Sequence, residues 1–153
     1  MKKIISVILA VLMLAVLAVP AFADDAIAIK TAEEFMAMES GKSYYLANDI
    51  DFGGKVFDTF IVPGTGFVVD LDGKGFTLKN FSFKAEAPTA DIAMFQQFAA
   101  GTRKNLNIGS ADAPIAYKLV DAKDSSRYAM LVASTKGDET PRIENVHIYT
   151  DME

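Results

Sequence analysis

The chain has 153 residues, with 15 basic and 20 acidic side chains, a formal net charge of −5 and no cysteine. Its length suits one domain, and its negative charge disfavours nucleic acid and anionic lipid surfaces as partners, because both would repel it. The lack of cysteine excludes a disulfide framework and thiolate chemistry.

The first 23 residues have the pattern of a cleaved secretory signal peptide. Lys2 and Lys3 form a basic start, residues 4–19 form a run that is apolar apart from Ser6, and the sequence Ala-Phe-Ala ends at Ala23. The run is shorter than the roughly 20 residues that a membrane-spanning helix needs, so a retained anchor fits less well. We predict cleavage after Ala23 and export to the medium or the cell surface. The mature chain, residues 24–153, keeps 13 basic and 20 acidic residues, a net charge of −7, and no membrane span.

A short helix is predicted over residues 31–39. Thr31 and Glu34 form a capping box, in which each side chain accepts a hydrogen bond from a free backbone N–H at the start of the helix. One apolar face follows at helical spacing: Ala32, Phe35 and Met38. Gly41 then ends the helix, which we expect to cover the first turn of the structure that follows.

The rest of the chain has the pattern of short strands separated by turns, which predicts an all-β fold. Apolar and polar residues alternate in residues 45–52, and residues 67–83 contain two strands joined by a tight turn at residues 72–75 that needs positive φ. Further strand-like segments are residues 56–62, 92–98, 105–108, 128–134 and 144–150. No second helical period occurs.

A short phrase recurs, in which an Asn is followed by apolar, polar and apolar residues. It is centred on Asn80, Asn105 and Asn145, which are 25 and 40 residues apart. The apolar positions change phase at the Asn, so one flat strand cannot bury both halves of the phrase. Asn tolerates left-handed backbone, and its amide can donate to and accept from another Asn one level away. We therefore expect these three residues at one structural corner in successive turns.

A second phrase, found in residues 92–98 and 128–134, precedes the last two copies of the first phrase. A period of 20 to 30 residues made of strands and corners indicates a β-solenoid, here a single domain with about five rungs in parallel. Short strands of an unrelated β-sandwich can look alike, so a β-sandwich is the alternative fold.

Residues 31–54 and 60–83 resemble the opening rungs of bacterial and archaeal adhesin-like surface proteins with GLUG-type repeats. The shared order is a short capping helix, a Tyr-x-Leu-x-x-Asp-Ile-Asp strand, a Pro-Gly turn, an Asp-Gly-x-Gly hairpin and a first Lys-Asn corner. The resemblance extends over about residues 29–149 and implies a right-handed parallel β-helix. The chain departs from the family in lacking the glycines of the Gly-Leu-Phe-Gly phrase, in having Phe76 in place of His, and in having Arg103 where a core aliphatic residue belongs.

Two Asp-x-Asp pairs could supply oxygen ligands to Ca²⁺: Asp49, Asp51, Asp70 and Asp72. An EF-hand loop needs oxygen ligands at positions 1, 3, 5 and 12, and counting from Asp70 puts Lys74 at position 5 and Phe81 at position 12. We therefore interpret these acids as turn and solvated surface residues, and predict no metal and no cofactor.

No catalytic constellation is evident in the sequence. His147 is the only histidine, and its place in the repeat predicts that it points outward without a matched acid or nucleophile. The arginines of the later part, Arg103, Arg127 and Arg142, are scattered rather than clustered as in polysaccharide-cleaving β-helix enzymes. An enzyme is therefore not expected.

We predict an exported, non-catalytic β-helix module, either adhesin-like or structural, whose partner is a cell-surface protein or a glycan. A secreted carbohydrate-binding module is the alternative, because five tyrosines could supply rings for a sugar: Tyr44, Tyr45, Tyr117, Tyr128 and Tyr149. The last rung, around residues 142–149, shows no matching cap, so we expect it to self-associate edge to edge or to dock a partner strand.

Overall fold

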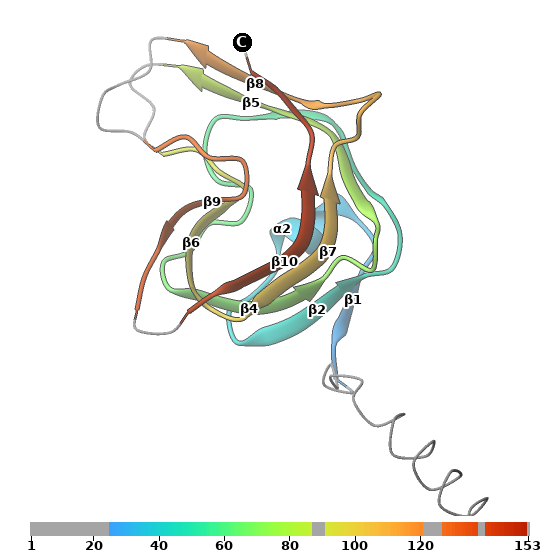
Figure 1. Ribbon diagram of the computed structural model, residues 1–153, viewed down its shortest axis with the longest axis vertical. Helices are drawn as coiled ribbons and strands as arrows, with labels where there is room; N and C mark the ends of the chain where they lie inside the picture. Colours follow the sequence, from blue (N-terminus) through green and yellow to red (C-terminus); the bar gives the residue numbers. More distant parts are fainter. Residues whose placement is uncertain (1–24, 87–90, 121–126, 138–139, 153) are drawn as a thin grey trace, which may run out of the picture.

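The computed structural model describes residues 25–86, 91–120, 127–137 and 140–152 (Figure 1). The predicted signal peptide, residues 1–23, lies outside the described residues, so its cleavage stays a prediction. Within the described ranges, no helix is both long and apolar enough to cross a membrane.

The described chain is almost entirely β-structure, with eleven strands in a single sheet. In chain order they are β1 (Ile27–Ile29), β2 (Lys42–Leu46), β3 (Ile50–Phe57), β4 (Phe67–Asp72), β5 (Thr77–Glu86), β6 (Phe95–Ala100), β7 (Thr102–Ile108), β8 (Ile115–Val120), β9 (Val132–Thr135), β10 (Arg142–Ile148) and β11 (Thr150–Met152). Every ladder between these strands is parallel. The all-β prediction is confirmed. The alternative of a β-sandwich is wrong, because its sheets would be antiparallel.

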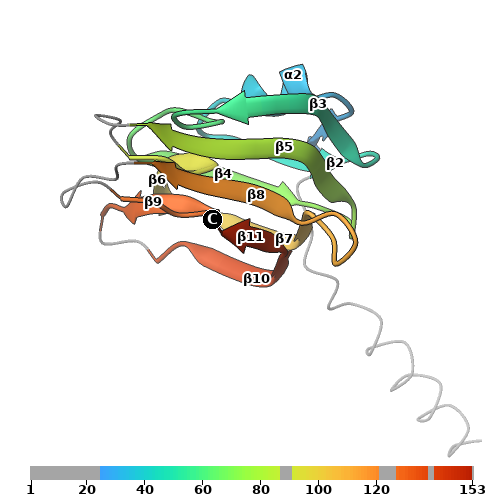
Figure 2. The same cartoon turned by 90° about the horizontal axis from the view of Figure 1, so that it is seen from above.

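The parallel ladders arrange the strands in three columns (Figures 1 and 2). The first column contains β1, β2, β4, β7 and β10, the second contains β3, β5, β8 and β11, and the third contains β6 and β9. From β4 onward the chain visits the three columns in the same order, and we call one such passage a circuit. Before β4 the pattern is incomplete, because α2 and not a strand of the second column follows β1, and only a bridge at Val62 lies in the third column between β3 and β4. Residues about 25 to 40 positions apart in the sequence therefore lie side by side, which places the same kind of bend in successive circuits.

The single described helix, α2 (Ala32–Met36), lies at the end of the stack where β1 and β3 are found (Figure 2). Thr31 Oγ1 accepts a hydrogen bond from the Glu34 backbone N–H at 3.2 Å, and the Glu34 carboxylate accepts one from the Thr31 N–H at 3.3 Å. The helix is shorter than the predicted residues 31–39, since its C-cap is already Ala37. The Phe35 side chain is fully buried, so the helix is attached to the sheet by its apolar face.

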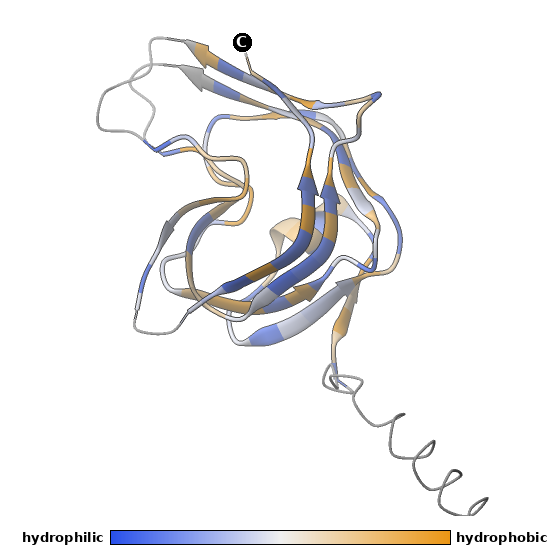
Figure 3. Ribbon diagram, in the orientation of Figure 1, coloured by the Kyte–Doolittle hydropathy of each residue, from blue (hydrophilic) through white to orange (hydrophobic). Residues whose placement is uncertain are grey.

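The core is formed by the inward-facing residues of the strands, and the alternation of hydrophobic and hydrophilic residues is visible along several strands in Figure 3. Aromatic rings connect the circuits: between ring centroids, Phe81 of β5 lies 5.0 Å from Phe52 of β3, and Phe83 of β5 lies 5.2 Å from Tyr117 of β8. Such pairs stabilise beyond their buried area, so the aromatic residues hold successive circuits together.

The turn at residues 72–75 does not form the hairpin that the resemblance implies. β4 and β5, which it connects, belong to different columns and do not pair with each other. Lys74 and Gly75 have φ of 52° and 83°, so the positive φ predicted for this turn is present. The turn instead sends the chain from the first column to the second.

All three asparagines of the repeated phrase have left-handed backbone, with φ of 59° at Asn80, 52° at Asn105 and 51° at Asn145. Asn145 lies directly on Asn105, and its Nδ2 donates to Asn105 Oδ1 at 2.9 Å. Asn80, however, lies at a different bend, because Leu78 pairs with Ile108, which is already past the bend at Asn105.

The turn at residues 72–75 accounts for the displacement of Asn80. It occupies the corner above Asn105: a Cβ atom added to Gly73 would lie 2.4 Å from the Asn105 backbone oxygen. The chain makes two bends in this circuit, one at Gly73 and Lys74 and one at Asn80. The expectation of one shared corner is therefore correct for two of the asparagines and wrong for Asn80.

Candidate functional site

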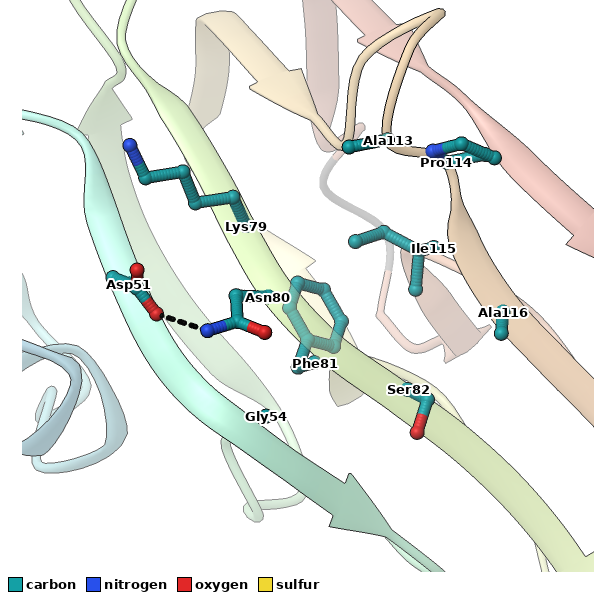
Figure 4. A pocket seen from close by; sticks show the side chains of 10 residues that line it. All are labelled: Asp51, Gly54, Lys79, Asn80, Phe81, Ser82, Ala113, Pro114, Ile115 and Ala116. Atoms are coloured by element: carbon teal, nitrogen blue, oxygen red, sulfur yellow. Dashed lines mark hydrogen bonds between the residues drawn. The ribbon is translucent and has the colours of Figure 1, made fainter.

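A surface hollow of about 490 Å³ lies around Asn80 (Figure 4). It crosses three neighbouring strands, β3, β5 and β8. The β3–β5 register shifts between Asp51 and Lys55, where Gly53 and Gly54 have positive φ. On the other side of β5, pairing with β7 stops at Leu78 and pairing with β8 begins at Ser82. The hollow thus lies where β5 has irregular neighbours on both sides.

The hollow around Asn80 contains a carboxylate, an amide, an ammonium and a hydroxyl group. Asp51 Oδ1 accepts from the Gly53 N–H and from Asn80 Nδ2, both at 2.8 Å. These two hydrogen bonds lower the pKa of Asp51, in that order of importance, so the carboxylate is ionised at neutral pH. Lys79 and Ser82 complete the polar lining. This mixture of donors and acceptors suits a ligand with several hydroxyl groups.

A second hollow, of about 440 Å³, adjoins the first one. Pro114 lines both hollows, and we call the combined depression the Pro114 groove. The second hollow contains Tyr149, whose side chain is 40% exposed, together with Ser110 and Asp151. An exposed ring beside hydroxyl and carboxylate groups can stack on the apolar face of a sugar while the polar groups bind its hydroxyls.

The structure gives the Asp-x-Asp pairs a structural role. Each acid accepts a hydrogen bond from the next circuit: Asp49 from the Thr77 N–H at 3.0 Å, Asp51 from Asn80 Nδ2 at 2.8 Å, Asp70 from the Thr102 N–H at 2.7 Å and Asp72 from Asn105 Nδ2 at 3.1 Å. Within the part of the chain that the structure describes, no group of three His, Cys, Asp or Glu side chains could hold a metal ion. These acids therefore connect successive circuits.

The hydrogen bonds shift the pKa values of these acids. The Thr77 N–H and the Lys79 ammonium lower the pKa of Asp49. Burial opposes ionisation of Asp72, yet the hydrogen bonds from Lys74 and Asn105 outweigh it and lower the pKa of Asp72. In the same way, the hydrogen bond from the Arg127 guanidinium lowers the pKa of Asp91.

Arg103 takes the core position predicted for an aliphatic residue and is fully buried. Its guanidinium lies 3.4 Å from the Phe98 ring centroid and donates to the backbone oxygens of Ala100 at 2.7 Å and Phe67 at 3.3 Å. Burial lowers the pKa of Arg103 to about 10, against the opposing charge of Asp70. The side chain therefore serves the core and is not available to a surface ligand. The repeat predicted that Arg103 lies at a core position, but it did not predict the backbone carbonyl groups that accept its hydrogen bonds.

The remaining candidates are dispersed over the molecule. His147 is exposed, with Nε2 3.1 Å from Asn145 Oδ1. Of the five tyrosines, Tyr44 and Tyr117 are buried, whereas Tyr149 is exposed and lies in the Pro114 groove. Sequence reasoning listed Tyr149 without distinguishing it from the others, and it missed Ser82, Ser110 and Pro114, which carry no motif.

Comparisons with protein-family models, with curated proteins and with solved structures gave no match.

Proposed function

We propose that the chain is an exported, non-catalytic, right-handed parallel β-helix module of the adhesin-like or structural kind, similar to GLUG-repeat surface proteins. The observation that carries this proposal is the order of the columns, which repeats from β4 to β11 with bends at corresponding places. The side chains at these bends support it further. The Asp-x-Asp acids are engaged in hydrogen bonds to the next circuit, which suits a stacking role better than paired acid–base catalysis.

In this proposal α2 is a cap. A β-helix has an open sheet edge at its first rung, which would invite unwanted strand pairing. Phe35 inserts from α2 into the core, with its ring centroid 5.8 Å from that of Phe52 and 6.0 Å from that of Phe95. The helix is therefore well placed to cover the first circuit.

Export can be tested by expressing all 153 residues in a bacterial host and measuring the mass of the protein outside the cytoplasm. We expect a chain that begins at Asp24, because the predicted cleavage follows Ala23. Replacing Ala21 and Ala23 with Arg should block processing and serves as the matched control. A wild-type chain that keeps residues 1–23 in the membrane fraction would contradict the proposal.

A carbohydrate-binding module is the second candidate function, and the Pro114 groove favours it. The groove offers one exposed ring, Tyr149, and polar groups on either side of Pro114, among them Asp51 and Lys79. The carboxylates would repel anionic sugars, so the groove fits neutral oligosaccharides.

An array of neutral and uronic-acid oligosaccharides, probed with residues 24–153, tests this second candidate. We expect retention on neutral probes, a loss of at least tenfold in Tyr149→Ala and little change in Tyr149→Phe, since Phe keeps the ring. Thr65→Ala, at an exposed turn away from the groove, is the control variant. No retention on any probe would leave the scaffold function alone standing.

A further inference from the structure

The end of the stack opposite α2 presents an open sheet edge with an apolar row (Figure 2). Among the described strands, β10 pairs with β7 alone and β11 with β8 alone. Ile143 and Ile148 are in register with the fully buried Arg103 and Ile108, yet they are 50% and 41% exposed. The inward row of the first column thus continues into β10, and no other described strand lies over it.

One row of side chains in the first column alternates in charge over its last three strands, β4, β7 and β10. Asp72 lies beside Lys104, with Nζ 3.9 Å from the carboxylate, and Lys104 lies beside Glu144 of β10. The next place in this row, beyond Glu144, is therefore best filled by a cationic or hydrogen-bond-donating side chain. β10 carries such a group itself, in the exposed His147 on the other side of the bend at Asn145.

We propose that β10 of one molecule pairs antiparallel with β10 of a second copy, about a two-fold axis that passes between Asn145 and Val146, at the bend. This axis is perpendicular to the direction in which the circuits stack. It therefore places the part of β10 before the bend opposite the part after the bend in the second copy. Ile143 then lies beside Ile148 of the second copy on the inward face. Glu144 lies beside His147 of the second copy on the outward face, where the imidazole can donate a hydrogen bond to the carboxylate.

A second copy fits this edge better than a strand of another kind, because the complementarity of β10 is with itself. By symmetry each contact occurs twice, as in other isologous interfaces. Head-to-tail stacking of copies is disfavoured, because α2 lies over the opposite end of the stack. The pairing goes beyond the proposed binding function and does not depend on it.

Sedimentation equilibrium of residues 24–153, which contain every described residue, tests the proposal. We expect a monomer–dimer equilibrium in the wild type. His147→Glu places two glutamates opposite each other twice per dimer and should raise the dissociation constant by roughly tenfold or more. The double variant Glu144→Lys with His147→Glu restores opposite charges in both contacts and should restore dimerisation.

Thr59→Glu is the matched control, because it makes the same change of charge at an exposed bend after β3. It should leave the dissociation constant unchanged. Equal thermal unfolding of all variants by circular dichroism would show that the fold is retained. A wild type that stays monomeric at the highest loading, or a double variant as dissociated as His147→Glu, would overturn the proposal.

Discussion

At the scale of the residue, the stack depends on positions where the backbone turns left-handed and where circuits approach closely. Four non-glycine residues of the described chain have positive φ: Lys74, Asn80, Asn105 and Asn145. For L-residues this conformation costs free energy, least for Asn, whose short polar side chain bonds locally. Here the amides of all three asparagines donate to a side chain of the preceding circuit, which offsets that cost.

A comparison of two glycines separates the free-energy cost of positive φ from the cost of a close contact between circuits. Gly41 and Gly101 have nearly equal φ, 83° and 87°, but a Cβ at Gly41 meets nothing within 4 Å whereas one at Gly101 would lie 2.2 Å from the Val69 oxygen. We expect Gly41→Ala to lower the free energy of unfolding by about 1 kcal/mol. Gly101→Ala should lower it by about 3 kcal/mol, since it also forces two circuits apart. Urea denaturation measures both, and equal losses would contradict the role of close approach.

At the scale of the element, α2 is too short to be stable by itself and depends on its cap and its buried ring. An isolated helix of five residues cannot overcome the cost of nucleation in water. The capping box satisfies backbone N–H groups at its start, and Phe35 provides the apolar contact with the sheet. β1 and β2, which flank the helix in the sequence, have only three and five residues, so they too rely on their neighbours in the columns.

Thr31→Ala removes the side-chain acceptor for the Glu34 N–H and should lower the free energy of unfolding by about 1 kcal/mol. Thr31→Ser keeps a hydroxyl group at the N-cap and should lose much less. Phe35→Ala, by contrast, removes a fully buried ring and should cost about 3 to 5 kcal/mol. Chemical denaturation of the three variants checks this order, and a Thr31→Ala loss matched by Thr31→Ser would exclude the capping role.

At the scale of the whole molecule, carboxylates between circuits make stability depend on pH. The pKa values of Asp49, Asp51, Asp72 and Asp91 are all lowered by hydrogen bonds or charges in the folded state. A lowered folded pKa means that ionisation favours folding. This stabilisation is complete above the pKa of the unfolded carboxyl, about 4, and is lost as the pH falls through the folded values.

We therefore expect the urea midpoint to be nearly constant from pH 7 to pH 5 and to fall below about pH 4. Asp72→Asn should lower the midpoint at pH 7 and weaken the dependence on acid pH, because it removes the most buried of these carboxylates. Asp112→Asn, at an exposed acid of the loop before β8, is the control and should resemble the wild type. Identical acid profiles for Asp72→Asn and the wild type would count against this role of Asp72.

The sequence by itself determined what is local: the capping box at Thr31 and Glu34, the alternation of the strands, and the left-handed bends at the asparagines. These depend on interactions within a few residues, which a sequence pattern records directly. Tertiary structure decided which bends lie above one another. Register is set by all the contacts of a strand with its neighbours, so the turn at residues 72–75 could displace Asn80 by one bend. The Pro114 groove is likewise a tertiary feature, because its residues come from five strands and the segments between them and share no spacing in the sequence.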